Sequence, residues 1–539
     1  MSDKDFSKLS PFELKDKLIK AATETHPSEL QEELLRAAIA RKGKGMLDAG
    51  RGNPNFLTTI PRQGFFEWGS FAMEEAERSF SYMGIGLGGL ARKEGIEARL
   101  DNFLHDKQTE GAHFIKNAVS YVRDQLGYDT EEFIYEMTKA ILGGDYPVPD
   151  RMLRISERIV KQYIRKEMSG GRPFDTKFEL FATEGGAAAM TYIFNTLEKN
   201  HLLKKGDSVA MGTPIFTPYL EIPELDEYNF VEVMAEAKSD RSWQYSSEDL
   251  DKLLDPKVKA FFLVNPSNPA SVKMSEENLE YLVKIIEQRP DLIVLTDDVY
   301  ATFADDFTSI FAVCPRNTIL VYSFSKYFGS TGWRLGVMAM AQDNAFDEML
   351  QKQPLEVREK LNLRYSSVAS DPSHLKLIDR VVADSRAVSL NHVAGLSTPA
   401  QVQMVFFCLF SLMDMQENYK KSLKALVRSR QKALYKYMGI KIDQNENTVG
   451  YYDIVEIEKV AEKLHGKEFS DWIRAHVNQE DALFRLADES GVVLLPASDF
   501  AASNGGFRVS LANLNEADYI KIGMAIARLL DKYYQEFTA

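Results

Sequence analysis

Short apolar segments alternate with helical segments from residue 178 onward, and this alternation constrains the fold more than any other feature of the chain. Such alternation is typical of a mainly parallel sheet whose two faces are covered by helices. The clearest helical segments are 185–197 and 276–287. The expected strands are 178–182, 208–212, 260–264, 292–296, 318–322 and 336–341. We therefore expect an α/β fold with this sheet in a large domain.

The chain before this alternation is mostly helical in pattern. Residues 10–41 are rich in Leu, Glu and Lys at helical spacing. A similar pattern occupies 65–79 and 94–142, with expected breaks at Gly111 and Gly127. These residues predict a helical region that precedes the sheet.

The end of the chain differs from both regions. Long helices follow residue 395, and short strands and helices follow them to the C-terminus, which is typical of a smaller α+β domain. The expected parts are 1–60, an N-terminal helical segment that joins the small domain; 61–390, the large domain, with a helical insertion near 90–145; and 391–539, the C-terminal small domain.

Composition and charge exclude several kinds of partner. The net charge of −14 has no basic stretch to offset it, which argues against nucleic-acid binding. The first twenty residues lack the apolar core of a signal peptide, and the most apolar run, 402–413, is too short to cross a bilayer and predicts a buried helix. Only two cysteines are present, without a pairing motif, as in a reducing cytoplasm. We expect a cytoplasmic protein, in which an anionic substrate needs a local basic pocket.

A lysine directly after an apolar strand is the strongest chemical signal. Lys326 follows the strand 318–322, two serines precede it at 323 and 325, and Arg334 lies eight residues further on. Most lysines lie on solvated surfaces, whereas a lysine that faces a pocket loses its proton readily and can form a Schiff base. A surface lysine after a strand is the alternative for this motif taken alone.

A carboxylate ends a neighbouring strand. Asp297 follows the apolar segment 292–296, and burial of a carboxylate is costly unless a cation meets it. A protonated pyridine nitrogen is such a cation. Asp298 is expected to be a solvated neighbour. A helix cap at the end of the strand is the alternative for this motif.

Glycines and an arginine supply two candidate anion sites. Gly185 and Gly186 open a helix after a strand, where free backbone N–H groups bind phosphate well. Arg508 lies among β-forming residues and can make a bidentate pair with a carboxylate. A plain strand–helix turn and a solvent-facing arginine are the respective alternatives.

Together these segments resemble fold-type-I pyridoxal-phosphate (PLP) enzymes of the class I aminotransferase group. The resemblance rests on six segments in the family's order, from residue 183 to residue 512, including Asn265-Pro-Ser-Asn268-Pro and Gly212-Thr-Pro-Ile-Phe216. It implies a fold-type-I transferase whose large domain binds PLP. Ala270-Ser271 replaces the usual Thr-Gly of the first loop, which leaves the detailed shape of that loop open.

The resemblance also implies roles for individual residues. Lys326 is the lysine that binds the cofactor aldehyde. Asp297 is placed at the ring nitrogen, and Phe216 lies against the ring, although a buried core aromatic would leave the same pattern. Arg508 holds the α-carboxylate of the substrate. The residues implied at the phosphate are Gly185, Gly186, Ser323 and Arg334, and those at the ring oxygen are Asn268 and Tyr300.

Further segments resemble the aspartate 4-decarboxylase branch of this group, notably 50–56, 143–151 and 391–399. That resemblance implies β-decarboxylation of L-aspartate to L-alanine and CO₂, with aspartate aminotransferase activity beside it and an oxo acid such as pyruvate as a second substrate. It implies a homodimer with shared active sites, and larger assemblies of such dimers, in which Tyr146 reaches the phosphate of a neighbouring subunit. The candidates for substrate binding beside Arg508 and Asn268 are Arg51, Gly52 and Arg386, with Arg364 a weaker candidate for the distal carboxylate.

A plain aspartate aminotransferase is the closest alternative. A transcription regulator with this fold would need an N-terminal DNA-binding domain, and residues 1–50 have neither the length nor the basic charge for one. Gly84-Ile-Gly86-Leu-Gly88-Gly89 matches a dinucleotide-binding pattern, but a charged helical segment precedes it instead of a strand. The dinucleotide reading therefore fails.

Overall fold

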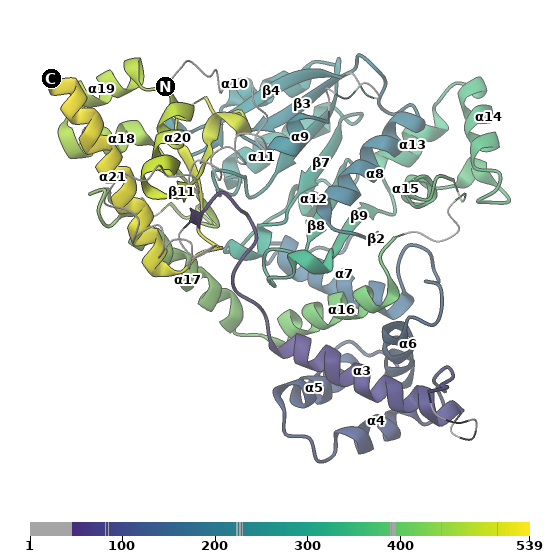
Figure 1. The fold of residues 1–539 in the computed structure, drawn as a ribbon. Coiled ribbons are helices and arrows are strands. Elements are labelled where there is room, and N and C mark those ends of the chain that lie inside the picture. The colour runs from purple at the N-terminus through teal and green to yellow at the C-terminus, as the bar shows by residue number, and fades with distance from the viewer. Residues whose placement is uncertain are drawn as a thin grey trace.

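The computed structural model describes residues 46–539 apart from positions within 81–85, 223–229, 389–394, 443–444 and residue 504. The helix expected at 10–41 lies outside the described residues. The described chain forms a large mixed sheet with its helices, a helical layer below it, and a smaller body that contains the C-terminus (Figure 1).

All six predicted strands are confirmed, and they lie in one eight-stranded sheet of order β2-β9-β8-β7-β6-β3-β4-β5. The central pairs are parallel, whereas β9 runs antiparallel to both of its neighbours and β5 runs antiparallel to β4. The sequence did not predict β4 and β5, which form one edge. The strands are β2 (Phe178–Thr183), β3 (Ser208–Thr213), β4 (Val231–Lys238), β5 (Gln244–Tyr245), β6 (Val258–Val264), β7 (Ile293–Asp297), β8 (Thr318–Ser323) and β9 (Gly336–Ala341).

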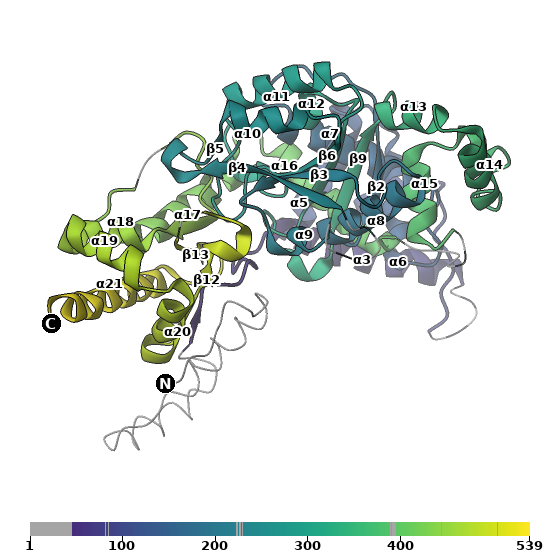
Figure 2. The same cartoon turned by 90° about the horizontal axis from the view of Figure 1, so that it is seen from above.

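Helices cover both faces of this sheet, as the alternation predicts. Because successive strand residues point to opposite faces, Phe261 packs with the residues of α11 (Glu276–Gln288), whereas Phe262 contacts Phe194 of α8 (Gly186–Lys199) at 5.7 Å between ring centres. Figure 2 shows α11 over one face and α8 below the other. Strands buried on both faces are apolar throughout, which explains why the sequence signal is strong.

A layer of helices lies beside the sheet and precedes it in sequence. The expected break at Gly111 is wrong, because Gly111 lies inside α5, which Thr109 caps by accepting a hydrogen bond from Ala112 N at 3.1 Å. A methyl group at Gly111 would contact Gly64 N at 2.9 Å, so glycine permits α3 and α5 to approach closely. The break at Gly127 is confirmed. The helices are α3 (Ile60–Ser79), α4 (Ile96–Leu104), α5 (Glu110–Asp124), α6 (Thr130–Leu142) and α7 (Arg154–Met168).

The apolar segment at 402–413 forms the buried helix that the sequence predicts. This helix, α16 (Thr398–Met413), packs against α3, α5, α6 and α7 in the main core. Among the described residues no helix is both long and apolar enough to cross a bilayer. The charged stretch between the sheet and α16 is helical and contains α13 (Ala345–Gln351), α14 (Leu355–Arg364) and α15 (Leu377–Ser385).

The smaller body has its own core and α+β composition. Its antiparallel sheet has the order β10-β13-β12, and β1 (Leu47–Asp48) pairs in parallel with β11 (Val492–Val493), so that residues near the start of the described chain join this body. The divisions at residues 60 and 390 stay predictions, and the packing of α16 favours a later second boundary. The other elements are α17 (Asn418–Tyr435), β10 (Tyr452–Val455), α18 (Ile457–His465), α19 (Lys467–His476), α20 (Gln479–Ser490), β12 (Leu495–Pro496), β13 (Phe507–Ser510) and α21 (Glu516–Thr538).

The contact between α17 and α21 depends on one glycine. A methyl group at Gly523 would overlap the carbonyl oxygen of Leu434, so Gly523→Ala is expected to lower the free energy of unfolding by about 1–3 kcal/mol. Gly69→Ala is the matched control, because its methyl group would meet only Ile141 at 3.7 Å and should stabilise α3 by roughly 0.5–1 kcal/mol. Thermal unfolding measures both. Equal melting temperatures in the two variants would contradict this packing.

Candidate active site

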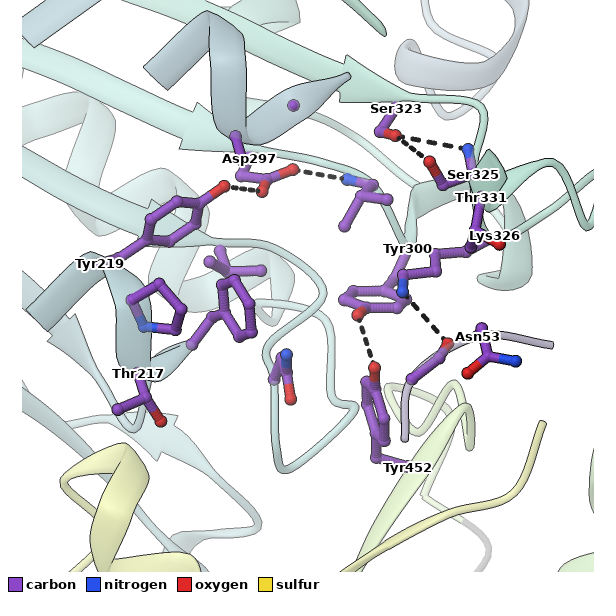
Figure 3. Close-up of a pocket in the computed structure, with 18 of the residues that line it drawn as sticks. Asn53, Thr217, Tyr219, Asp297, Tyr300, Ser323, Ser325, Lys326, Thr331 and Tyr452 are labelled. Atoms are coloured by element: carbon purple, nitrogen blue, oxygen red, sulfur yellow. Dashed lines mark hydrogen bonds between the residues drawn. The ribbon is translucent and has the colours of Figure 1, made fainter. Parts of the chain in front are cut away.

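A cavity of about 570 Å³ lies where the carboxyl ends of the central strands face the smaller body. Most of the residues selected from the sequence line it (Figure 3). Parallel strands bring their carboxyl ends to one edge, so motifs that are far apart in the sequence meet there. The predicted residues in the wall are Arg51, Gly52, Gly186, Phe216, Asn268, Asp297, Tyr300, Ser323, Lys326, Arg334 and Arg508.

Lys326 extends into this cavity from the turn that follows β8. Its Nζ donates to the carbonyl oxygen of Gly52 at 3.1 Å. The two serines beside it are buried and joined, with Ser323 Oγ donating to Ser325 Oγ at 2.9 Å. The amine is therefore held by a short buried turn and directed at the cavity, as the sequence predicts.

Asp297 ends β7 on the opposite side of the cavity (Figure 3). The Tyr219 hydroxyl donates to Asp297 Oδ2 at 2.7 Å, and Val299 N donates to Oδ1 at 3.1 Å. Burial raises the pKa of Asp297 to about 6, although these hydrogen bonds and Lys326 lower it. A buried carboxylate of this kind favours a cationic partner. No role for Tyr219 was predicted from the sequence, although it lies three residues after Phe216.

The expectation that Asp298 is solvated is wrong. Its side chain is fully buried behind the strand, where the Thr296 hydroxyl donates to it. Burial raises the pKa of Asp298 to about 7, and the hydroxyl groups of Ser309 and Thr296 oppose that rise. Successive residues at a strand end point to opposite sides, so one aspartate enters the cavity and the other enters the core.

The start of α8 lies against the end of β8, the strand that precedes Lys326, at the edge of the cavity. Gly185 has φ = +97°, a conformation that favours glycine, and a methyl group there would overlap the guanidinium of Arg334. Gly186 lies against Ser323 and Asp297, where a methyl group would be 3.6 Å and 4.0 Å from their atoms. Arg334 donates to the carbonyl oxygens of Thr331 and Glu184. Free N–H groups at the helix start and one cation therefore face the same corner, as a phosphate site requires.

Arg508 lies on β13, buried between two aromatic rings. Its guanidinium carbon is 4.5 Å from the ring centre of Tyr452 and 4.8 Å from that of Phe500. Its Nη2 donates to the carbonyl oxygen of Gly50 at 2.5 Å and its Nη1 to Asn268 Oδ1 at 3.4 Å. Its Nε is buried and has no hydrogen-bond partner among the described residues. A carboxylate is the usual hydrogen-bond partner of a buried guanidinium group.

The loop in which Ala270-Ser271 replaces the usual Thr-Gly still forms part of the cavity wall. Asn268 lines the cavity, and Ser271 adopts φ = +56°, the conformation that a glycine would take. The Ser271 hydroxyl accepts a hydrogen bond from Tyr452 N at 2.9 Å. The replacement of Thr-Gly by Ala-Ser therefore leaves the turn formed and adds a contact to β10.

Tyr452 is a wall residue that the sequence analysis missed, because it lies on a short strand without a recognised motif. Tyr300 Oη donates to Tyr452 Oη at 3.1 Å. Burial raises the pKa of Tyr300 well above the usual value. Burial acts in the same direction on Tyr452, but the positive charges of Lys326 and Arg508 outweigh it, and the pKa of Tyr452 is lowered.

Gly52 and Arg51 complete the wall from the N-terminal side. A methyl group at Gly52 would overlap the Tyr452 hydroxyl and would lie 3.1 Å from Lys326 Nζ, so only glycine fits between them. Arg51 is half-exposed at the entrance, where its Nε contacts Asp48 Oδ2 at 3.0 Å. The long side chain is therefore placed to meet an anion that enters the cavity.

Four predicted residues do not line this cavity, and one of them, Gly185, adjoins it through its contact with Arg334. Arg386 is buried at the end of α15 and pairs with Asp150 at 2.8 Å, and Arg364 pairs with the buried Asp384 at 2.8 Å. Neither arginine lines the cavity of its own chain, where a carboxylate elsewhere holds each one, and a role for either in substrate binding stays a prediction. Tyr146 is 70% exposed and also lies off the cavity wall, so a role at a neighbouring subunit stays a prediction.

The sequence matches the family model for aminotransferases of class I and II over residues 160–525, and the chain belongs to this family. A bifunctional aspartate aminotransferase and L-aspartate beta-decarboxylase from a Pseudomonas species is 53% identical to it over 515 residues, which are 95% of this chain and 97% of that protein. An aspartate aminotransferase from Thermotoga maritima is 30% identical over 233 residues, 42% of this chain and 54% of that protein.

Solved structures show the same fold at lower identity. The aspartate aminotransferase from Thermus thermophilus with maleate has a TM-score of 0.56 and 18% identity, over 95% of this chain and 98% of that chain. An aromatic aminotransferase from Pyrococcus horikoshii has a TM-score of 0.56 and 17% identity, over 93% and 100% of the two chains. The predicted fold-type-I architecture is confirmed.

The buried position of Asp298 predicts a specific pH dependence of stability. Its pKa is about 7 in the folded protein and about 3.9 in an unfolded chain, so the folded state binds more protons between these values and loses stability as the pH rises through them. Asp298→Asn is neutral at every pH. We expect it to raise the melting temperature by a few degrees at about pH 8 and to change it little at about pH 4.

The exposed Asp106 provides the control, because its side chain is 99% exposed and Asp106→Asn should leave the melting temperature unchanged at both pH values. An Asp298→Asn effect of equal size at the two pH values would contradict a raised pKa at this position.

Proposed function

We propose that this cavity binds PLP covalently at Lys326 and catalyses the β-decarboxylation of L-aspartate to L-alanine and CO₂, with aspartate aminotransferase activity beside it. The single observation that carries the proposal is that Lys326 and Asp297, from the ends of adjacent strands, line one cavity with Arg508. The 53% identity to a bifunctional enzyme over almost the whole chain supports the choice of reaction.

The chemistry of the wall residues fits PLP. Asp297 is a buried acid with a raised pKa and matches a protonated ring nitrogen. The start of α8 and Arg334 match a phosphate, and Phe216, which stands edge-on to Tyr219 at 5.3 Å between ring centres, matches an aromatic ring. Asn268 and Tyr300 match the ring oxygen. When bound, PLP supplies an electron-withdrawing ring that accepts electrons from the substrate carbon atoms.

The substrate fits between the two arginines of the wall. Arg508 is rigidly stacked and retains a buried Nε donor for the α-carboxylate. Arg51, at the entrance, meets the distal carboxylate. Arg51 is exposed and contacts Asp48, so its side chain can change conformation when a substrate binds. A weak interaction suits the distal carboxylate, because its negative charge moves away as CO₂ forms.

Lys326 acts as the general base for the α-proton. Its Nζ lies beside Gly52 at the centre of the wall, and the neighbouring charges belong to Asp297 on one side and Arg508 on the other. A neutral amine accepts the proton from Cα and returns it at the end of the cycle. The narrow space at Gly52 keeps this amine close to the reacting carbon.

A plain aspartate aminotransferase is the second candidate, because relatives with that name share the fold and the family. The two functions differ in the product formed without an added oxo acid. In the first function an oxo acid such as pyruvate restores the cofactor after occasional transamination. In the second it is a required substrate.

Assembly and location form part of the proposal. A homodimer with shared active sites, and a larger assembly of such dimers, are supported by the exposed Tyr146 and by exposed apolar side chains on α3, Phe66 and Met73. Cys314 and Cys408 are unpaired, which supports a cytoplasmic location.

Replacement of Lys326 tests the proposal. With L-aspartate alone, the wild-type enzyme should release alanine and CO₂ in equal amounts. Lys326→Ala should lose the visible absorption of the lysine-linked cofactor and lower turnover by about 10²–10⁴-fold or more, since it removes both the covalent link and the base. Alanine, CO₂ and the absorption spectrum are measured together.

Lys352→Ala serves as the control, because this lysine is 77% exposed and lies off the cavity wall. Oxaloacetate without alanine from the wild type would favour the second candidate. Normal decarboxylation by Lys326→Ala would contradict both.

A further inference from the structure

Decarboxylation at Cβ needs a proton that transamination does not. When the bond between Cβ and the distal carboxyl carbon breaks, CO₂ leaves and its electron pair passes from Cβ toward the electron-withdrawing group on Cα, which leaves Cβ nucleophilic. A hydrogen must then be added to Cβ before alanine can form. Lys326 already has the task of moving the proton of Cα, so the wall needs a second proton carrier if the decarboxylation is to be fast.

The hydroxyl groups of the wall differ in their readiness to supply that proton. The Tyr219 hydroxyl donates its hydrogen bond to Asp297, and the Ser323 hydroxyl donates its hydrogen bond to Ser325. The Tyr300 hydroxyl donates its hydrogen bond to Tyr452. Tyr452 itself accepts from Tyr300 and, in the part of the chain that the structure describes, no acceptor takes its own proton. The Tyr452 proton therefore remains available to a molecule in the cavity.

The place of the Tyr452 hydroxyl fits the path of the substrate. It lies so near Gly52 that a methyl group there would overlap it, and the same methyl group would be 3.1 Å from Lys326 Nζ. The Tyr452 ring also stacks on Arg508 at 4.5 Å. A substrate whose α-carboxylate is on Arg508 and whose Cα faces Lys326 has its Cβ one bond from the carbon at Lys326 and two bonds from the carboxylate carbon at Arg508.

Electrostatics favours proton release at this hydroxyl over the other tyrosines of the wall. Burial raises the pKa values of Tyr219 and Tyr300 well above normal. Burial also acts on Tyr452, but Lys326 and Arg508 lower its pKa overall, since two positive charges stabilise the phenolate.

The backbone of Tyr452 is fixed by the residue that departs from the usual family loop. Ser271 Oγ accepts from Tyr452 N at 2.9 Å, and the carbonyl oxygen of Ser271 accepts from Val449 N at 2.8 Å. A glycine at position 271 would keep the second contact and lose the first. The serine therefore adds a support specific to Tyr452.

We propose that Tyr452 is the acid that protonates Cβ after CO₂ leaves, and so directs the reaction to alanine. The Tyr452 O–H bond breaks, a Cβ–H bond forms, and the phenolate is held by Arg508, the protonated Lys326 and the Tyr300 hydroxyl. Water then returns a proton to the phenolate, so that one solvent proton is consumed for each CO₂ released. This role rests on the proposed function.

Tyr452→Phe in the PLP-loaded full-length enzyme tests the role. With L-aspartate, the rate of alanine and CO₂ formation should fall by about 100-fold or more, because a general acid is removed. The transfer of the amino group from aspartate, measured as oxaloacetate in a single turnover, uses Lys326 and not Tyr452 to move protons and should fall no more than a few fold. The ratio of the two products separates this role from a structural one.

Tyr163→Phe is the matched control. Tyr163 and Tyr322 form a second buried pair of hydroxyl groups, at 2.7 Å, and neither lines the cavity. The control variant should keep the wild-type product ratio. Equal decarboxylation by Tyr452→Phe and wild type, or an equal fall of both activities, would overturn the role of Tyr452 alone. A wild type that gives oxaloacetate and no alanine would overturn the proposed function, and this role with it.

A measurement on the protein without PLP is independent of turnover. Tyrosinate absorption is followed during a pH titration of the wild type and of Tyr452→Phe. The difference between the two curves should show one tyrosine that ionises below the midpoint of free tyrosine. A difference curve with a midpoint above that of free tyrosine would contradict a proton donor at position 452.

Discussion

The site depends on one carboxylate that the fold forces out of water. Asp297 ends β7 inside the sheet, with Tyr219 donating to one oxygen and Val299 N to the other. Burial raises its pKa to about 6, because a low-dielectric environment disfavours the charged form. A cation in front of Asp297 removes this penalty and restores the charge. The other wall residues are arranged around that pairing, because the adjacent strand β8 delivers Lys326 to the same edge.

This arrangement requires the large sheet and the smaller body to keep fixed positions relative to each other. The large sheet supplies Lys326 and Asp297, and the smaller body supplies Arg508 and Tyr452, with Gly52 between them. Their contacts are short and specific: Arg508 reaches Gly50 at 2.5 Å, and Ser271 holds Tyr452 at 2.9 Å. Residues near the start of the described chain pair with β11 of the smaller body and then cross the cavity. The segment that crosses the cavity therefore forms part of its wall and also connects the two bodies.

The sequence predicts most of the fold and much of the site, for physical reasons that also explain the misses. Strands buried on both faces are continuously apolar and were found, whereas β4, next to the edge strand β5, is mostly only partly buried and was missed. Most residues in motifs after strands line the cavity. Asp298 was misplaced because neighbouring residues at a strand end point in opposite directions. Tyr452 has no motif, and Arg386 and Arg364 are held by carboxylates that only the folded chain brings to them.

We propose that Asp297 keeps the ring nitrogen of bound PLP protonated while Lys326 holds its aldehyde. Nitrogen NMR of the enzyme loaded with ring-¹⁵N PLP measures the protonation directly. The wild type should show a protonated ring nitrogen above neutral pH, and Asp297→Asn should show an unprotonated one, because the compensating negative charge is gone. The same unprotonated signal in both proteins would contradict the account.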